Sequence, residues 1–302
     1  MKLKNLMLSL CISTTILVLG SSNVFAKNIL NKTNHVSINE YDMYKKIDTQ
    51  NNVTPTQTNS MVKKYIQSAE NLGKKDYEEL KNLGYSDSKI NLLKKASNSN
   101  LNEAELKSIG SELSFYATLD TFDYDKSFNL NPLQPQGQGP QSPVFKTAIE
   151  LNYDWSWSQI PIVTNTDGIA FNWYTTCNDK LQLYNTTDSV DYYDKPGIDG
   201  FKSAYPCSDA AKNNLNSAQN GLYITFPMYN KAKNLYALSG SSYNILVNPS
   251  AKISDFYTNG VYAQSTSAST PEFVVNSNSI QVNSAANLMP LNYHFTPNDA
   301  WY

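Results

Sequence analysis

Residues 145–157 read Phe-Lys-Thr-Ala-Ile-Glu-Leu-Asn-Tyr-Asp-Trp-Ser-Trp, and this stretch decides the fold class of the chain. Large apolar side chains occupy most of the odd-numbered positions, and polar or small side chains lie between them. Because successive side chains of a strand point to opposite faces of a sheet, a period of two predicts a long strand with one buried face and one polar face.

Further strand candidates follow this stretch toward the C-terminus, at 162–164, 169–176, 222–228, 243–247, 256–257, 261–262, 273–275 and 279–282. The turn-forming sequences Asn165-Thr166-Asp167-Gly168 and Asn259-Gly260 predict hairpins between neighbouring strands. A helix is expected at 208–221, capped by Ser208. Short strands joined by turns predict an antiparallel all-β domain, a sandwich or barrel-like fold, over residues 144–302.

The periodicity becomes helical upstream of this domain. Residues 61–115 carry apolar side chains at helical spacing, Gly84 ends one short helix, and Asn102 with Glu105 begins another as a capping box. Residues 27–60 are polar without periodicity and predict a flexible leader. Residues 116–143 predict a linker, rich in Pro, Gln and Gly at 131–143. The chain is therefore expected to be α+β, with a small helical region before a mainly antiparallel β domain.

The first 26 residues have the features of an export signal. Lys2 and Lys4 provide a positive start, residues 6–19 are mostly apolar, and Val24-Phe25-Ala26 resembles a cleavage site. We therefore expect a secreted protein whose mature chain begins at Lys27. No second long apolar segment follows, so no transmembrane anchor is expected after cleavage.

The charge balance argues against a nucleic-acid partner. The chain has 24 basic and 26 acidic residues, and every basic residue is lysine. Without arginine, the chain lacks the side chain that pairs most often through two parallel hydrogen bonds with carboxylates and phosphates. Mechanisms that depend on such a clamp are correspondingly disfavoured.

Two cysteines, Cys177 and Cys207, remain after the expected cleavage. Thiols of exported proteins are often oxidised, so we expect a disulfide between them. The alternative is a pair of buried free thiols.

Most catalytic sequence motifs are absent. The chain has no Gly-x-Ser-x-Gly, His-Glu-x-x-His or Cys-x-x-Cys motif and no phosphate-binding Gly-Lys-Ser/Thr loop. We therefore expect no cofactor and no enzymatic activity of these classes. Asp188, Asp191 and Asp194 are close in sequence and remain candidate Ca²⁺ ligands. Alternatively, two such carboxylates could hydrolyse a glycosidic bond, or the segment is an ordinary solvated acidic loop.

Aromatic side chains are concentrated near the first strands, and sugar rings commonly stack on such side chains. The candidate ligand-binding residues are Tyr153, Trp155, Trp157, Trp173, Tyr174 and Tyr192. The alternative interpretation is that these side chains form the hydrophobic core, because tryptophan in an alternating strand is usually buried.

The sequence thus favours a secreted binding protein that recognises polysaccharide, cell-wall or cell-surface material. One alternative is a secreted antagonistic factor, bacteriocin-like or membrane-active, whose helical region is a propeptide. The Ser/Thr/Asn-rich stretch 263–287 has enough residues for a membrane-inserting pair of strands, although ordinary surface strands explain it equally well. A carboxylate-based glycan hydrolase is the second alternative.

Overall fold

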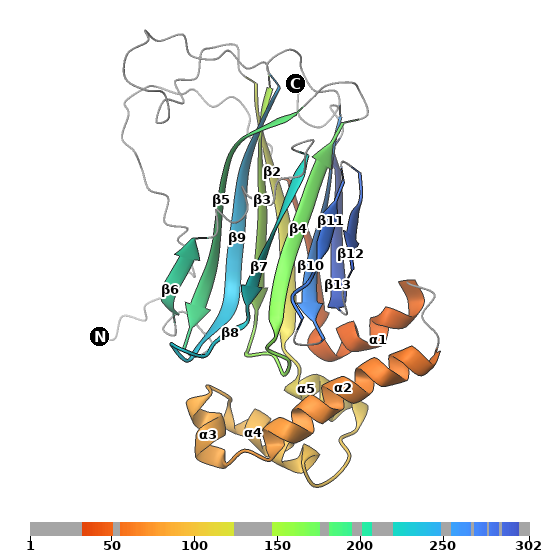
Figure 1. Ribbon diagram of the computed structural model, residues 1–302, viewed down its shortest axis with the longest axis vertical. Coiled ribbons are helices and arrows are strands. Elements are labelled where there is room, and N and C mark those ends of the chain that lie inside the picture. The colour runs from red at the N-terminus through yellow and green to blue at the C-terminus, as the bar shows by residue number, and fades with distance from the viewer. Residues whose placement is uncertain are drawn as a thin grey trace, which may run out of the picture.

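The computed structural model describes residues 32–50, 55–123, 147–175, 181–194, 201–206, 220–248, 255–266, 269–276, 278–283 and 286–295. Two antiparallel sheets pack face to face, and a group of short helices lies at one end of them (Figure 1). The predicted fold class is confirmed: the chain is α+β, mainly antiparallel, with a small helical region.

The large sheet has seven strands, in the order β1-β2-β3-β9-β5-β6, with β8 paired to β9. Its strands are β1 Lys32–Asn39, β2 Glu112–Asp123, β3 Thr147–Trp157, β5 Gln182–Tyr193, β6 Phe201–Pro206, β8 Tyr229–Asn230 and β9 Leu235–Asn248. The alternation in 145–157 corresponds to β3. Its odd-numbered side chains from 149 onward face the core, while Asn152, Asp154 and Ser156 keep some exposure.

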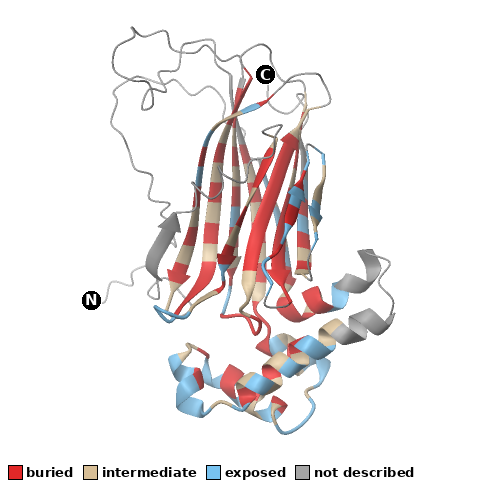
Figure 2. Ribbon diagram, viewed as in Figure 1, coloured by how far each residue is buried: buried red, intermediate tan, exposed pale blue. Residues whose placement is uncertain are grey.

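The small sheet has four strands, in the order β13-β10-β4-β7. They are β4 Thr166–Tyr174, β7 Gly221–Pro227, β10 Phe256–Ser265 and β13 Ala286–Phe295. A hairpin of β11 Phe273–Val275 and β12 Ile280–Val282 covers part of its outer face through Phe273 and Val275. Because β4 lies between this hairpin and the large sheet, seven consecutive residues of β4 are buried, as its red ribbon in Figure 2 shows.

The stretch 263–287 therefore does not form a long strand pair. It contains the end of β10, the β11–β12 hairpin and the start of β13. Each hairpin strand has three residues, whereas a strand that crosses a membrane needs about ten.

Aromatic rings fill the space between the two sheets. Trp155 stacks on Phe226 with ring centroids 4.8 Å apart, and Tyr153 stacks on Phe171 at 4.9 Å. The Tyr153 ring lies directly over Gly260 of β10, where an added Cβ would come within 2.4 Å of it. The Tyr153 ring of the large sheet thus fits because the small sheet has a glycine opposite it.

The helices are α1 Glu40–Gln50, α2 Pro55–Gly73, α3 Tyr77–Asn82, α4 Asp87–Ala96 and α5 Glu103–Ile109. Asp76 and Ser86 cap α3 and α4 with side-chain oxygens that accept backbone N–H groups. Asn102 and Glu105 form the predicted capping box of α5. The five helices lie together beneath one end of the sheets (Figure 1).

The helical region is an insertion between two neighbouring strands. β1 precedes it, β2 follows it, and the two strands pair from Lys32↔Leu119 to Asn39↔Glu112. The predicted leader 27–60 is therefore not flexible over 32–50, where β1 and α1 form. The predicted linker 116–143 begins too early, because β2 extends to Asp123. Alternating apolar side chains at 113–119 anchor β2 in the core.

Both predicted hairpin turns are wrong. Asn259-Gly260 lies in the middle of β10, and Thr166-Asp167-Gly168 lies within β4. β4 pairs with β7 and β10, so residues 162–164 are not its partner. The export signal, residues 131–143 and the expected helix up to residue 219 lie outside the described residues.

Candidate ligand-binding cleft

A buried carboxylate joins the helices to the sheets. Glu40 is the first residue of α1 and is fully buried. Its Oε2 accepts the backbone N–H groups of Ile162 at 2.9 Å and Ser111 at 3.4 Å. Its Oε1 accepts the N–H of Val163 at 3.0 Å and the Gln264 side-chain amide at 3.3 Å. Burial raises the pKa of Glu40, and the charge of Lys89 and the backbone N–H groups oppose part of that rise.

A buried lysine holds the same β3–β4 segment from the other side. Lys89 of α4 is 2 % exposed, and its Nζ donates to the carbonyl oxygen of Ile160 at 2.7 Å. The ammonium also lies 5.2 Å from the centre of the Tyr85 ring. Burial lowers the pKa of Lys89 to about 8, against the opposing charge of Glu40. Residues 160–163 are therefore fixed between two buried charges.

A third buried ionisable group lies between the sheets. Asp167 of β4 accepts the Tyr262 hydroxyl at 2.8 Å and the Ser265 N–H at 3.2 Å. The Trp157 indole N–H in turn donates to the Tyr262 oxygen at 3.0 Å. Burial raises the pKa of Asp167 well above its usual value. The group belongs to the core and does not face the surface.

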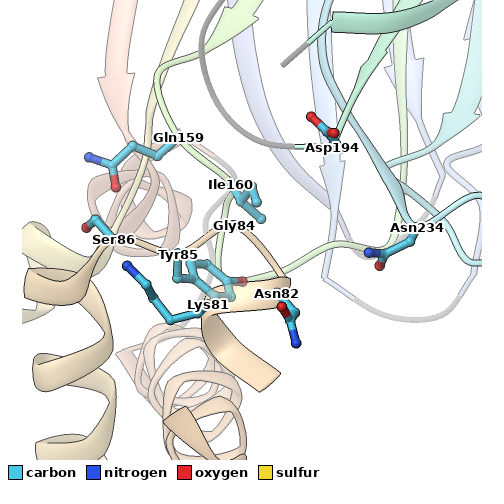
Figure 3. A pocket seen from close by; sticks show the side chains of 9 residues that line it. All are labelled: Lys81, Asn82, Gly84, Tyr85, Ser86, Gln159, Ile160, Asp194 and Asn234. Atoms are coloured by element: carbon cyan, nitrogen blue, oxygen red, sulfur yellow. The ribbon is translucent and has the colours of Figure 1, made fainter. Parts of the chain in front are cut away.

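An open cleft of about 760 Å³ lies beside this junction, within the range of typical ligand pockets. Figure 3 shows it between the α3–α4 corner and the nearby end of the sheets. It is lined by Lys81, Asn82, Gly84, Tyr85, Ser86, Gln159, Ile160, Asp194 and Asn234.

The α3–α4 corner forms one wall. Gly84 has φ 86°, a left-handed conformation that ends α3 at low steric cost. Beyond it the buried Tyr85 hydroxyl donates to the Pro161 carbonyl at 3.4 Å, which fixes the corner to the rigid segment described above. Lys81 forms an ion pair with Asp87 at 2.5 Å. Hydrogen bonds from Lys81 and Tyr77 lower the pKa of Asp87.

The sheets form the opposite wall. Asn234 ends the β8–β9 turn with φ 52°, a conformation that asparagine tolerates better than most residues. Its Oδ1 accepts the Tyr229 hydroxyl at 2.9 Å, and Tyr229 stacks on Tyr236. Asp194 follows the end of β5 (Figure 3). The cleft walls are thus held by turns with defined backbone geometry.

The described lining residues offer mainly hydrogen-bonding groups. Three amide side chains, the Ser86 hydroxyl, one ammonium and one carboxylate offer donors and acceptors, and the buried Tyr85 and Ile160 complete the described lining. Among the lining residues that the structure describes there is no pair of carboxylates and no cysteine or histidine. Within the described parts of the chain, no three His, Cys, Asp or Glu residues converge as metal ligands.

The predicted aromatic binding residues lie mostly in the core. Tyr153, Trp155, Trp157 and Trp173 are each at most 4 % exposed. They therefore pack between the sheets, as the alternative interpretation held, and offer no surface for a sugar ring. Tyr192 is also buried, and its hydroxyl donates to the Pro227 carbonyl at 2.8 Å.

Tyr174 is the one candidate aromatic that keeps partial exposure. It lies at the end of β4 and stacks on Tyr257 of β10, with centroids 4.8 Å apart and planes 9° apart. It is not part of the cleft lining.

The three candidate calcium ligands do not converge. Asp188 is fully buried and accepts the Thr186 hydroxyl at 2.9 Å, whereas Asp191 lies on the outer face of the large sheet and accepts the Ser239 hydroxyl at 3.1 Å. Asp194 lines the cleft. The expectation of one shared ion site is thus corrected, because strand alternation places Asp188 and Asp191 on opposite faces. Cys177 and Cys207 lie outside the described residues, so their disulfide stays a prediction.

Sequence reasoning missed most of the cleft. Asn82, Gln159 and Asn234 come from three distant segments and share no motif. The available signals were Gly84, which marks a helix end beside Tyr85 and Ser86, and Asp194, one of the candidate carboxylates.

Comparisons with known proteins identify no family. No family model matches the sequence, and no curated protein matches it. Among solved structures, the chain is similar to a collagen-binding domain from a Staphylococcus aureus adhesin, with TM-score 0.26 and 11% identity over 49% of this chain and 87% of that chain.

It is also similar to a structure described as manganese lipoxygenase of Gaeumannomyces graminis with partial zonadhesin of Komagataella pastoris. There the TM-score is 0.25 and the identity 11%, and the match covers 62% of each chain. Similarities this weak carry no functional argument.

Among the described residues, no helix is both long and apolar enough to cross a membrane.

Proposed function

We propose that this chain is an exported binding protein that holds a polar segment of extracellular polysaccharide or cell-wall material in the cleft. The observation that carries the proposal is the lining itself, an open cleft with amide, hydroxyl and charged groups. Neutral amides and hydroxyls match the many hydroxyl and amide groups of a glycan. Export is inferred from the N-terminal signal sequence.

Preorganised walls support a binding role. The Gly84 and Asn234 turns set the backbone of the two walls, and Lys89 with Glu40 fixes the segment that leads to Ile160. A site whose walls are rigid before binding loses less conformational entropy when the ligand arrives.

The two alternative functions have less support. A carboxylate-based hydrolase needs a second carboxylate opposite Asp194, and among the residues that the structure describes the cleft lining includes none. A detachable helical propeptide is opposed by the topology, because β1 and β2 flank the helices and both belong to the large sheet.

A retention assay tests the proposal. The chain 27–302 is incubated with purified cell walls and with an immobilised panel of polysaccharides. The double variant Asn82→Ala/Asn234→Gly removes two cleft amides, and glycine at 234 keeps the positive φ without strain. The matched control is Asn91→Ala, which removes an exposed amide from α4.

We expect at least one polysaccharide to retain the wild-type chain. The double variant should be retained about tenfold more weakly, and Asn91→Ala should be retained as strongly as the wild type. Equal retention by the double variant would refute the cleft as the site. Failure of the wild-type chain to retain any polysaccharide or cell wall would refute the function.

A further inference from the structure

The outer face of the large sheet carries regular rows of polar side chains. One row crosses five strands as Ser37, Ser114, Ser156, Ser239 and Asp191. The neighbouring row is His35, Tyr116, Asp154, Ser241 and Ser189. All of these side chains are partly or fully exposed. We call this surface, with Glu112, Glu150, Tyr193 and Tyr243, the acidic face.

The charges on the acidic face have one sign. Among the side chains that the structure describes there, four are carboxylates and none is a lysine: Glu112, Glu150, Asp154 and Asp191. Residues 111–302 as a whole contain nine lysines and sixteen acidic residues. The local surface and the surrounding domain thus both attract cations.

Three of the four carboxylates lie beside a tyrosine. Asp154 is the register neighbour of Tyr116. The Tyr243 hydroxyl donates to Glu150 Oε1 at 2.5 Å. The third pair is bridged by a serine, because the Ser239 hydroxyl donates to Asp191 at 3.1 Å and lies 2.9 Å from the Tyr193 hydroxyl.

A carboxylate next to an aromatic ring provides both an ion-pair partner and a cation–π partner for an ammonium or guanidinium group. The hydroxyls between these pairs are mostly small serines, so few long side chains obstruct the approach of an extended chain. His35, stacked on Tyr116 at 4.2 Å, adds a further ring.

We propose that the acidic face binds a lysine- or arginine-rich polypeptide segment. Charge complementarity identifies the chemistry of this partner, and the repeated carboxylate–tyrosine pairs match several cationic side chains along one extended segment. The surface is separate from the cleft and shares no residue with its lining.

Fluorescence anisotropy with labelled octalysine tests the proposal, with octaglutamate and a Gly-Ser octamer as control probes. The face variant Glu112→Gln/Asp154→Asn/Asp191→Asn removes three charges and keeps side-chain size. The matched control Glu70→Gln/Glu78→Gln/Glu103→Gln removes three charges from the helical region. Thermal melts confirm that each variant is folded.

We expect the face variant to weaken octalysine binding at least about tenfold, and added salt to weaken wild-type binding. The control variant should change binding less than about twofold. Tyr116→Leu should weaken binding a few-fold and Tyr116→Phe should restore it, because the ring and not the hydroxyl attracts the cation.

Equal loss in the two triple variants, or equal binding of octalysine and octaglutamate, would overturn the proposal. So would unchanged binding by the face variant. The cleft variant Asn82→Ala/Asn234→Gly should bind octalysine like the wild type. The two proposals therefore succeed or fail separately.

Discussion

Glu40 is an ionisable side chain at a fully buried position, a combination that is rare in folded proteins. It begins α1, it is fully buried, and its two oxygens accept hydrogen bonds from the β3–β4 segment, from Ser111 and from β10. Removing the carboxylate would leave buried backbone N–H groups unpaired and Lys89 without its opposite charge. The cost of burying this charge is therefore offset only while the whole set of contacts is present.

Glu40→Ala should lower the free energy of unfolding by about 3–5 kcal/mol, the range for breaking a buried pair. Glu103→Ala removes an exposed carboxylate paired with Lys45 and should lower the free energy of unfolding far less. Denaturant unfolding of both variants measures the difference. Similar costs would show that Glu40 does not anchor the helices.

Lys89 should make stability depend on pH above neutrality. Its pKa is lowered to about 8 in the folded chain, so the folded state releases this proton while the unfolded state keeps it up to about pH 10. The unfolded state then binds more protons, and stability from this group rises with pH between those values. Below pH 8 Lys89 is protonated in both the folded and the unfolded state, so the burial of its charge lowers the free energy of unfolding by the full amount.

Subtracting the pH profile of Lys89→Met isolates the effect from the titration of tyrosines. Between pH 7 and pH 10 the free energy of unfolding of the wild type should rise by up to about 3 kcal/mol relative to that of the variant. Chemical unfolding at a series of pH values measures this difference. A constant difference would contradict the pKa assignment.

At the level of elements, β1 and β2 make the sheets depend on the helical half of the chain. Phe115 and Leu119 of β2 are buried in the same core as β3, and β1 covers the outer edge of β2. A chain that begins at residue 144 would lose both strands and expose β3 as a hydrophobic edge.

We therefore expect the fragment 144–302 to aggregate or to show no cooperative melting, while 27–302 melts cooperatively. A fragment 111–302, which keeps β2, should be intermediate. Size-exclusion chromatography and circular dichroism distinguish these outcomes. A monomeric, cooperatively folded 144–302 fragment would contradict the expected dependence.

Strong periodicity predicted elements well, and short or ambiguous signals did not. The alternation in 145–157 identified β3, and the capping box at Asn102 identified the start of α5. β1 and β2 were missed although Leu113, Phe115, Ala117 and Leu119 alternate correctly. A helical region precedes β2 directly, and only its pairing with β1 and β3 shows that the strand belongs to the sheet.

The turn signals failed for a physical reason. Asn259-Gly260 looked like a hairpin turn, but Gly260 is needed in β10 because the Tyr153 ring occupies the space of a side chain. Asp167 resembled a turn residue, but it is a buried acceptor for Tyr262. Glycine and aspartate occur both in turns and inside strands, so the local sequence does not distinguish the two kinds of position.

At the scale of the whole molecule, the candidate site was the least predictable part. The cleft brings together residues 81–86, 159–160, 194 and 234, which meet only through the tertiary fold. Most of the aromatic side chains predicted to bind a ligand instead form part of the core between the two sheets. Composition favoured a binding role, but it did not locate the surface.

Export remains a prediction at this scale. Protein collected from culture medium should begin at Lys27, because Val24-Phe25-Ala26 provides small residues at the cleavage positions. N-terminal sequencing checks this. Secreted protein that retains Met1 would contradict it.

The disulfide between Cys177 and Cys207 also remains a prediction. In the loop-entropy model, linking residues thirty positions apart stabilises the folded state by roughly 3 to 4 kcal/mol. The non-reduced mature chain should be two hydrogens lighter than the reduced one, and reduction should lower its melting temperature. Two thiols that alkylate freely in native protein would exclude the bond.

The insertion of five helices between paired strands constrains the order of folding. Joining β1 to β2 across an unstructured segment of about 70 residues would cost about 4 kcal/mol of chain entropy. Folded helices would lower this entropy cost, because they bring the two ends of the insertion close together. In the folded chain the Glu40 N–H donates to the Ser111 carbonyl at 2.8 Å and joins these ends. The helices should therefore form early, and the large sheet should complete its edge late.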